Sequence, residues 1–224
     1  MKSGLRRSML KIVIAVLVLP LLVIVVYRFI APPITPLMVI RLVQGEGWDY
    51  RWTPLKQVSP HLERAVLAAE DSRFCSHHGF DVDAISDELD DWMQGERPRG
   101  ASTVTQQTAK NIVLWPGRDL VRKAIEAWLT PQIELVWNKR RILEVYLNVI
   151  EIGPGIYGVE AAAQRFFGKS AAQVTPREAA LIAAVLPNPR ERSPARPSAL
   201  VARRAGRIAA RAEMMDSYLD CLRT

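Results

Sequence analysis

The 224-residue chain is poor in the residues that build disulfide frameworks and metal centres. It has only two cysteines and three histidines, and no Cys-x-x-Cys pair. Cys75, His77 and His78 lie close together, but a structural zinc site typically draws four ligands from two spaced pairs, and no second pair exists. We therefore predict no metal site in this cluster. The sequence leaves open whether Cys75 and Cys221 form a disulfide.

Acidic residues are missing from the first 45 positions, which hold six basic residues: Lys2, Arg6, Arg7, Lys11, Arg28 and Arg41. The formal charge of the chain is +7, so the remaining residues are nearly balanced, with 24 basic against 23 acidic. Nucleic-acid binding needs a basic face on the folded domain. The charge distribution therefore gives no reason to expect a nucleic-acid partner.

Long hydrophobic runs are also rare, and the one present covers residues 12–27 without a charge. Extended to residue 31, the run would form a helix about 30 Å long, the thickness of a bilayer core. An Ala-x-Ala-like cleavage site does not follow it, which argues against a cleaved signal peptide. We predict a transmembrane helix over 12–31 and, by the positive-inside rule, a cytoplasmic segment 1–11. A linker over 32–58 and a domain over 59–224 would then lie outside the membrane.

Strand signals are nearly absent, and helix signals recur along the chain. Ser59-Pro60 is typical of a helix start, and residues 82–94 form an acidic amphipathic pattern. Residues 170–173 and 175–178 both have the spacing of a capping box. A basic amphipathic helix is expected over 198–222. The chain is therefore predicted to be mainly α.

Glu70 and Asp71 are adjacent acids that follow the apolar run 65–69. Burial and like-charge repulsion would raise the pKa of one of them. A carboxylate with a raised pKa can serve as a general base or acid near neutral pH. The alternative is that both acids are solvated at a helix end.

A second polar cluster covers residues 100–111. Its hydroxyl residues suit a helix N-terminus, whose free N–H groups can hold an anion. On a helix, Thr103, Gln107, Lys110 and Asn111 share one face. This pattern favours the wall of a polar cleft over an exposed helix.

A third cluster places Arg122 and Lys123 four and three residues before Glu126, on one helical face. It is either a surface salt bridge or a phosphate clamp, since Arg grips oxyanions with two parallel hydrogen bonds and Lys adds a point charge. Pro131 should kink this helix, because it cannot donate to the carbonyl of Ala127. Leu143, Tyr146 and Leu147 form an apolar stripe typical of a core helix.

These clusters occur in an order that resembles one family closely. The motifs are Glu-Asp-x-x-Phe-x-x-His-x-Gly-x-Asp, Gly-x-Ser-Thr-x-Thr-Gln-Gln-x-x-Lys-Asn, Arg-Lys-x-x-Glu, Arg-Ile-Leu-Glu-x-Tyr-Leu-Asn and Glu-Ala-Ala-x-x-Ala-x-x-Leu-Pro-Asn-Pro. Between residues 60 and 190 the chain is similar to the peptidoglycan glycosyltransferases of the penicillin-binding-protein type, in their monofunctional, membrane-anchored form. The resemblance implies a lysozyme-like fold and polymerisation of lipid II into glycan strands, with inversion, release of undecaprenyl diphosphate and no transpeptidase activity.

The resemblance also implies residue roles. Glu70 matches the general base, and Glu126 matches a second glutamate near the leaving diphosphate. Lys110, Arg122 and Lys123 match the residues that hold the diphosphates. The cleft would be lined by Asp71, Phe74, Ser102, Thr103, Gln107 and Asn111. The sequence requires no cofactor, and the resemblance allows a divalent metal, Mg²⁺ or Mn²⁺, at the donor diphosphate.

The implied partners are lipid II, the growing lipid-linked glycan chain, the membrane, and other cell-wall synthesis or division proteins. The implied location is the bacterial inner membrane, with the catalytic domain on the periplasmic side. Two alternatives stay open. One is a lysozyme-like muramidase that cuts glycan, which would not need a cationic diphosphate clamp. The other is a non-catalytic membrane protein that binds lipid II or a division partner.

Overall fold

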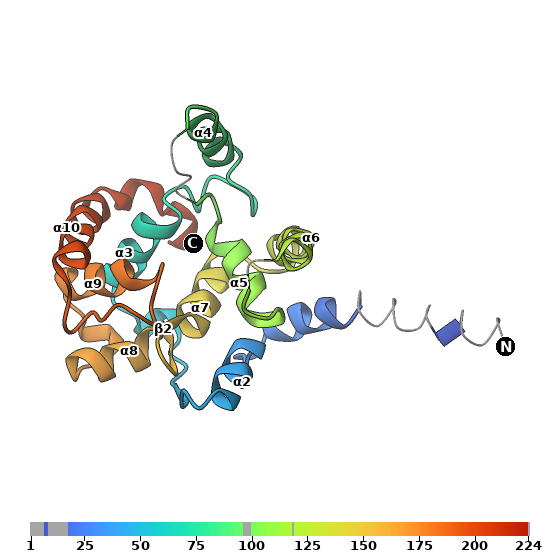
Figure 1. The fold of residues 1–224 in the computed structure, drawn as a ribbon, viewed down its shortest axis with the longest axis horizontal. Helices are drawn as coiled ribbons and strands as arrows, with labels where there is room; N and C mark the ends of the chain where they lie inside the picture. Colours follow the sequence, from blue (N-terminus) through green and yellow to red (C-terminus); the bar gives the residue numbers. More distant parts are fainter. Residues whose placement is uncertain (1–6, 9–17, 96–99, 118, 224) are drawn as a thin grey trace.

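A computed structural model of the chain describes residues 7–8, 18–95, 100–117 and 119–223 (Figure 1). The described chain is mainly helical, which confirms the predicted class. In chain order the elements are α2 (Pro36–Val43), β1 (Asp49–Tyr50), η1 (Leu55–Gln57), α3 (Pro60–Glu70), α4 (Val82–Met93), α5 (Val104–Val113), α6 (Leu120–Val136), α7 (Lys139–Val149), β2 (Glu151–Gly153), β3 (Ile156–Tyr157), α8 (Gly158–Phe167), η2 (Ala171–Gln173), α9 (Pro176–Val185), α10 (Ala199–Glu213), η3 (Met215–Tyr218) and η4 (Asp220–Leu222).

Two groups of helices meet around α7. Helices α3, α9 and α10 pack against one another on one side, and α5 contacts both α6 and α7 on the other (Figure 1). The predicted stripe on α7 lies in the core, with Leu143, Tyr146 and Leu147 at most 1% exposed. Helix α4 stands apart at the edge of the molecule and has no buried residue.

Several predicted helix ends are confirmed. The Ser59 side chain caps α3, and Thr175 forms a capping box with Glu178 at the start of α9. The other predicted capping box is wrong, because Ser170 makes no side-chain cap and precedes only a short 3-10 turn. The terminal helix is also shorter than expected. It ends at Glu213, where the chain turns so that Met215, Leu219 and Leu222 can be buried.

The two cysteines form a disulfide that fastens this C-terminal segment. Cys75 lies in the loop after α3, and Cys221 lies in η4, with a Cα–Cα distance of 5.5 Å. The Arg140 guanidinium on α7 donates to the carbonyl of Leu222. Arg64 on α3 pairs with Asp216 at 2.9 Å. The segment after α10 therefore joins α3, α7 and the loop that follows α3.

Helix α6 continues through Pro131 as a single element, and the kink expected at this residue stays a prediction. The Thr130 hydroxyl donates to the Glu126 carbonyl at 2.7 Å, inside the turn that precedes the proline. Gly79, with φ +94°, rests on this turn, since a Cβ at that position would lie 2.7 Å from Thr130 Cγ2. A larger residue at 79 would push the loop after α3 away from α6.

The N-terminal part of the chain is attached to this domain. Residues 18–27 form a helix, whose Ile24 carbonyl accepts from Trp137 Nε1 at 2.8 Å. Arg141 donates to the Tyr27 carbonyl at 2.7 Å. Residues 32–58, predicted as a linker, fold onto the domain through α2 and through β1, which pairs in parallel with β3.

The predicted membrane span over 12–31 is covered only in part, because residues 12–17 lie outside the described residues. Within the described part of the chain, no helix has the length and apolar character required to cross a membrane.

Candidate active site

Glu70 is the last residue of α3, and its two carboxylate oxygens meet different neighbours. Oε2 accepts a hydrogen bond from Gln107 Nε2 at 3.0 Å. The Gln107 oxygen in turn accepts from the Tyr146 hydroxyl at 3.0 Å, which fixes the direction of the amide. Oε1 faces Arg204 Nη2 of α10 at 3.7 Å, and 14% of the Glu70 side chain is exposed. One oxygen is therefore held by an amide, and the other lies near a cation without a hydrogen bond to it.

Burial raises the pKa of Glu70 above the ordinary value of a glutamate. The hydrogen bond from Gln107 and the charges of Arg204 and Lys110 oppose this effect, and Asp71 adds a small further rise. The expectation that one of the adjacent acids has a raised pKa agrees with this environment. Desolvation contributes more than the like charge of the neighbour.

The Asp71 carboxylate is turned into the protein. It contacts His77 Nε2 at 3.0 Å and accepts from the Val104 backbone N–H, at the first turn of α5, at 2.9 Å. The other nitrogen of His77 accepts from the Gly79 N–H at 3.1 Å. The predicted anion site at the N-terminus of α5 therefore exists, and the protein's own Asp71 occupies it.

Two residues expected to line the cleft have mainly internal contacts. Phe74 is fully buried, with Lys139 Nζ 4.5 Å from its ring centre, so it supports the cleft wall from behind instead of lining it. This corrects the expectation, because an aromatic ring gains more by complete burial in the core than at a polar surface. Thr103 borders the site, but its hydroxyl caps α5 and donates to the Gly79 carbonyl at 2.7 Å.

The third cluster is buried and is not a surface salt bridge. Glu126 pairs with Arg122 and with Lys123, each at 2.5 Å, and only 3% of its side chain is exposed. Lys123 also donates to the Ser102 hydroxyl at 3.0 Å, and 42% of its side chain faces solvent. Arg122 Nε is buried and, among the described residues, has no hydrogen-bond acceptor. The cluster therefore has donor capacity that an oxyanion could use.

The charge of Lys110 interacts with both glutamates. Burial lowers its pKa, the charges of Glu126 and Glu70 raise it, and Arg122 and Lys123 lower it. Because all four charges act on Lys110, the polar clusters on α3, α5 and α6 form one electrostatic unit. The sequence predicted each cluster separately, and the fold brings them together.

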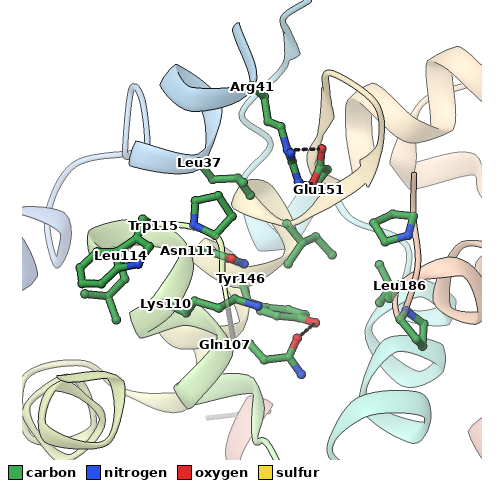
Figure 2. A pocket seen from close by; sticks show the side chains of 15 residues that line it. Leu37, Arg41, Gln107, Lys110, Asn111, Leu114, Trp115, Tyr146, Glu151 and Leu186 are labelled. Atoms are coloured by element: carbon green, nitrogen blue, oxygen red, sulfur yellow. Dashed lines mark hydrogen bonds and ion pairs between the residues drawn. The ribbon is translucent and has the colours of Figure 1, made fainter. Parts of the chain in front are cut away.

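Two hollows lie near the polar clusters, and Glu70 lines the second of them. The first, of about 230 Å³, is lined by Gln107, Lys110, Asn111 and Tyr146 on one wall (Figure 2). Its other walls include Leu37, Arg41, Leu114, Trp115, Glu151 and Leu186. The second, of about 120 Å³, is lined by Glu70, Asp71, Ser102, Thr103 and Arg211, among others. The Glu70–Gln107 hydrogen bond joins a residue of one hollow to a residue of the other.

Sequence patterns missed two contributors to this site. Tyr146 was assigned only to the core stripe, although its hydroxyl orients Gln107. Arg204 lies outside all the motifs, in the segment expected only to form a basic amphipathic helix. The feature of the sequence that could have indicated a role for Arg204 is its position next to the apolar stripe of α10, which consists of Val201, Ala205 and Ile208.

The side chains at this site do not fit a resident divalent metal ion. Both oxygens of Glu126 are engaged by cations. The part of the chain that the structure describes holds no group of three His, Cys, Asp or Glu side chains arranged to bind a metal. Mg²⁺ prefers carboxylate, phosphate and water oxygens without competing cations. Cys75 is engaged in the disulfide.

The fold and the site together define a class of protein: a mainly helical domain with a desolvated carboxylate beside a buried Arg–Lys cluster, as expected of a transferase whose leaving group is an oxyanion. The sequence model of the family described as "Transglycosylase" matches residues 39–213. The chain belongs to this transglycosylase family.

Similar proteins cover nearly the same length. A biosynthetic peptidoglycan transglycosylase of Caulobacter vibrioides is 49% identical over 220 residues, which cover 97% of this chain and 96% of the relative. Proteins with the same description from Rhodospirillum centenum and Bdellovibrio bacteriovorus are 54% and 52% identical, over 88% and 91% of this chain and 86% and 84% of their own lengths.

Proposed function

We propose that the chain is a peptidoglycan glycosyltransferase that polymerises lipid II and releases undecaprenyl diphosphate. The observation that carries the proposal is the placement of Glu70, a carboxylate with a raised pKa, within one electrostatic unit with Lys110, Arg122 and Lys123. Membership of the transglycosylase family and the description of the relatives support the same reaction.

In the proposed step, Glu70 acts as the general base. Oε2 is held by Gln107, so Oε1 is free to accept the proton from the 4-hydroxyl of the incoming lipid II sugar. The hydroxyl oxygen attacks the anomeric carbon of the donor while the bond from that carbon to the diphosphate oxygen breaks. The configuration at the anomeric carbon inverts, as in inverting glycosidases, with a sugar hydroxyl in place of water.

The departing diphosphate takes the electrons of the broken bond, and the cationic cluster stabilises its charge. Lys110, Arg122 and Lys123 are the groups we assign to this role. Arg122 Nε is a buried donor that could bind an oxyanion. Lys123 is the more exposed of the two cations that pair with Glu126. Glu126 keeps the two cations in place. Preorganised charges of this kind need little rearrangement as the leaving group forms.

We further propose a lysozyme-like arrangement of the helices, with residues 12–31 as a membrane anchor and 1–11 in the cytoplasm. The uncharged run in the sequence supports the anchor. The catalytic domain, which we place from about residue 59 to 224, would lie on the periplasmic side of the bacterial inner membrane. Since a lipid substrate diffuses within the bilayer, an anchored enzyme searches for it in two dimensions. Lipid II and the lipid-linked glycan chain are the proposed partners.

A muramidase is disfavoured by the cationic cluster, because hydrolysis of glycan releases no diphosphate. A non-catalytic lipid II binder is disfavoured by the desolvation of Glu70, which costs free energy and is offset only by one hydrogen bond from Gln107 and by the nearby charges of Arg204 and Lys110.

The test is incubation of the purified protein with labelled lipid II, beside Glu70→Gln and Glu63→Gln. Glu63 is a matched control, because it lies on the same helix and burial also raises its pKa, to about 7. We expect polymer from the wild type and Glu63→Gln, and a loss of about 10²- to 10⁴-fold in Glu70→Gln. Equal polymer from all three would reject Glu70 as the base. Digestion of finished glycan would favour the muramidase.

A further inference from the structure

Helix α10 brings a cation to Oε1 of Glu70, the oxygen that Gln107 does not hold. The helix starts at the Ser198 cap and packs on α3 and α9. Its buried stripe, Val201, Ala205 and Ile208, sets the rotation of the helix, so that Arg204 points towards the end of α3. The result is a distance of 3.7 Å between Arg204 Nη2 and Glu70 Oε1.

The contact has two properties that separate it from an ordinary salt bridge. The distance is too long for a direct hydrogen bond but short enough for a strong interaction between charges. Arg204 Nε is buried and finds no hydrogen-bond acceptor among the described residues. A buried donor without a hydrogen-bond partner lowers the stability of the folded protein. Among the described residues, Arg204 Nε makes no hydrogen bond that would offset this loss. The favourable interaction visible for this guanidinium is with the charge of Glu70.

We infer that Arg204 is a positioning residue for the reaction, which keeps Glu70 ionised while leaving Oε1 free for the hydroxyl of the acceptor. The inference rests on the proposed role of Glu70 as the general base. A direct hydrogen bond from Arg204 would occupy the lone pair that must receive the proton. At 3.7 Å the guanidinium supplies charge without that competition. It also favours loss of the proton from Glu70 after each transfer, which readies the base for the next one.

The charged and titratable groups around Glu70 support this assignment. Desolvation favours the protonated acid, and Asp71 acts in the same direction. Three contacts favour the carboxylate: Gln107 by hydrogen bond, and Arg204 and Lys110 by charge. Tyr146 on α7 is neutral, because burial raises its pKa, and Arg211 lines the same hollow as Glu70. Lys110 also interacts with the charge of Glu126, whereas the ion pair that Arg204 makes among the described residues is with Glu70.

The first measurement is the pH dependence of kcat/KM for polymerisation in Arg204→Gln, Arg204→Lys and Arg203→Gln. Arg203 is the matched control, an exposed neighbour on the same helix. Loss of the cation raises the pKa of Glu70, so the acidic limb of the profile should move to higher pH. We expect about a tenfold loss at pH 6 that shrinks at higher pH. Arg204→Lys should restore most of the profile, and Arg203→Gln should leave it unchanged.

The second measurement is a titration of the Glu70 carboxyl by carbon-13 NMR, in the full chain without substrate. Its midpoint should move to higher pH in Arg204→Gln and stay unchanged in Arg203→Gln. An unmoved midpoint, or an activity loss of equal size at every pH, would overturn the inference. The titration does not depend on turnover, so it decides about Arg204 even if Glu70→Gln proves active and the proposed function fails. If Arg204→Gln does not fold, as judged by circular dichroism, Arg204→Met replaces it in both measurements.

Discussion

The site holds two glutamates, one buried and one largely buried, whose surroundings differ. Glu126 has a cation on each oxygen at 2.5 Å, supplied by Arg122 and Lys123 of its own helix. Glu70 has a neutral amide on one oxygen and a cation at 3.7 Å from the other, supplied by two other helices. The burial of Glu126 is therefore compensated locally, within one turn of α6. The burial of Glu70 is compensated only in part, and only in the folded domain.

The difference shows how one fold can keep two carboxylates for separate tasks. A carboxylate enclosed by cations is a poor proton acceptor, and it serves to hold those cations. A desolvated carboxylate with one free oxygen is suited to receive a proton. The proposed roles of Glu70 and Glu126 follow from these neighbours, and the predictions below change a carboxylate, one of its neighbours or the disulfide near the end of α3.

The largest expected contrast is in stability. Glu126→Gln removes the charge that pairs Arg122, so a buried cation remains uncompensated. We expect the free energy of unfolding to fall by about 3–5 kcal/mol. Glu70→Gln removes a desolvated charge without a direct cationic contact, and should be neutral or slightly stabilising at neutral pH. Urea denaturation followed by circular dichroism measures both. Equal losses in the two variants would contradict the comparison.

The second prediction concerns the disulfide, which lies on the Glu70 side of the site. Replacing both Cys75 and Cys221 by Ala should lower the free energy of unfolding by about 2–4 kcal/mol, because the unfolded chain gains conformational freedom. Addition of a reductant to the wild type should lower the thermal midpoint in the same direction. The double variant is the control for the reductant. If the reductant also lowered the thermal midpoint of this variant, it would be acting at a site other than the disulfide.

The smallest effect is expected at Gln107. Gln107→Leu removes the hydrogen bond that favours the Glu70 carboxylate, so the pKa of Glu70 should rise further. A raised pKa leaves less of the base ionised, so activity should fall about tenfold at neutral pH and recover as the pH increases.

Tyr146→Phe is the control for Gln107→Leu, since it removes only the bond that orients the amide. We expect a smaller loss in this variant, of a few-fold. If both variants lost activity equally at every pH, the role of Gln107 would be structural. The pH profile of polymerisation therefore separates an effect on the base from an effect on packing.

Local patterns predicted the parts of this molecule that depend on local physics. The cap at Ser59, the capping box at Thr175 and the stripe through Leu143 are all within one or two turns of the residues they organise. The spacing of Arg122 and Glu126 also predicted their contact, although not its burial.

The parts that local patterns did not show depend on tertiary contacts. Helix α5 lines a hollow with Gln107, Lys110 and Asn111, as predicted, but Thr105 and Thr108 on the same helix are fully buried. The Thr108 hydroxyl donates to the Val104 carbonyl, and that of Thr105 donates to Glu134, so burial costs little. The approach of Arg204 to Glu70 spans 134 positions in sequence and follows from the packing of α10, which no short motif encodes.

The disulfide also changes the covalent topology of the domain. It joins positions 146 residues apart, so residues 75–221 form a closed ring, and Glu70 lies just before this ring on the N-terminal arm of the chain. A single cut of the chain anywhere within that ring leaves one molecule of unchanged size until the disulfide is reduced. The arm with the proposed base and the ring with the cationic cluster therefore stay linked through a nicked backbone.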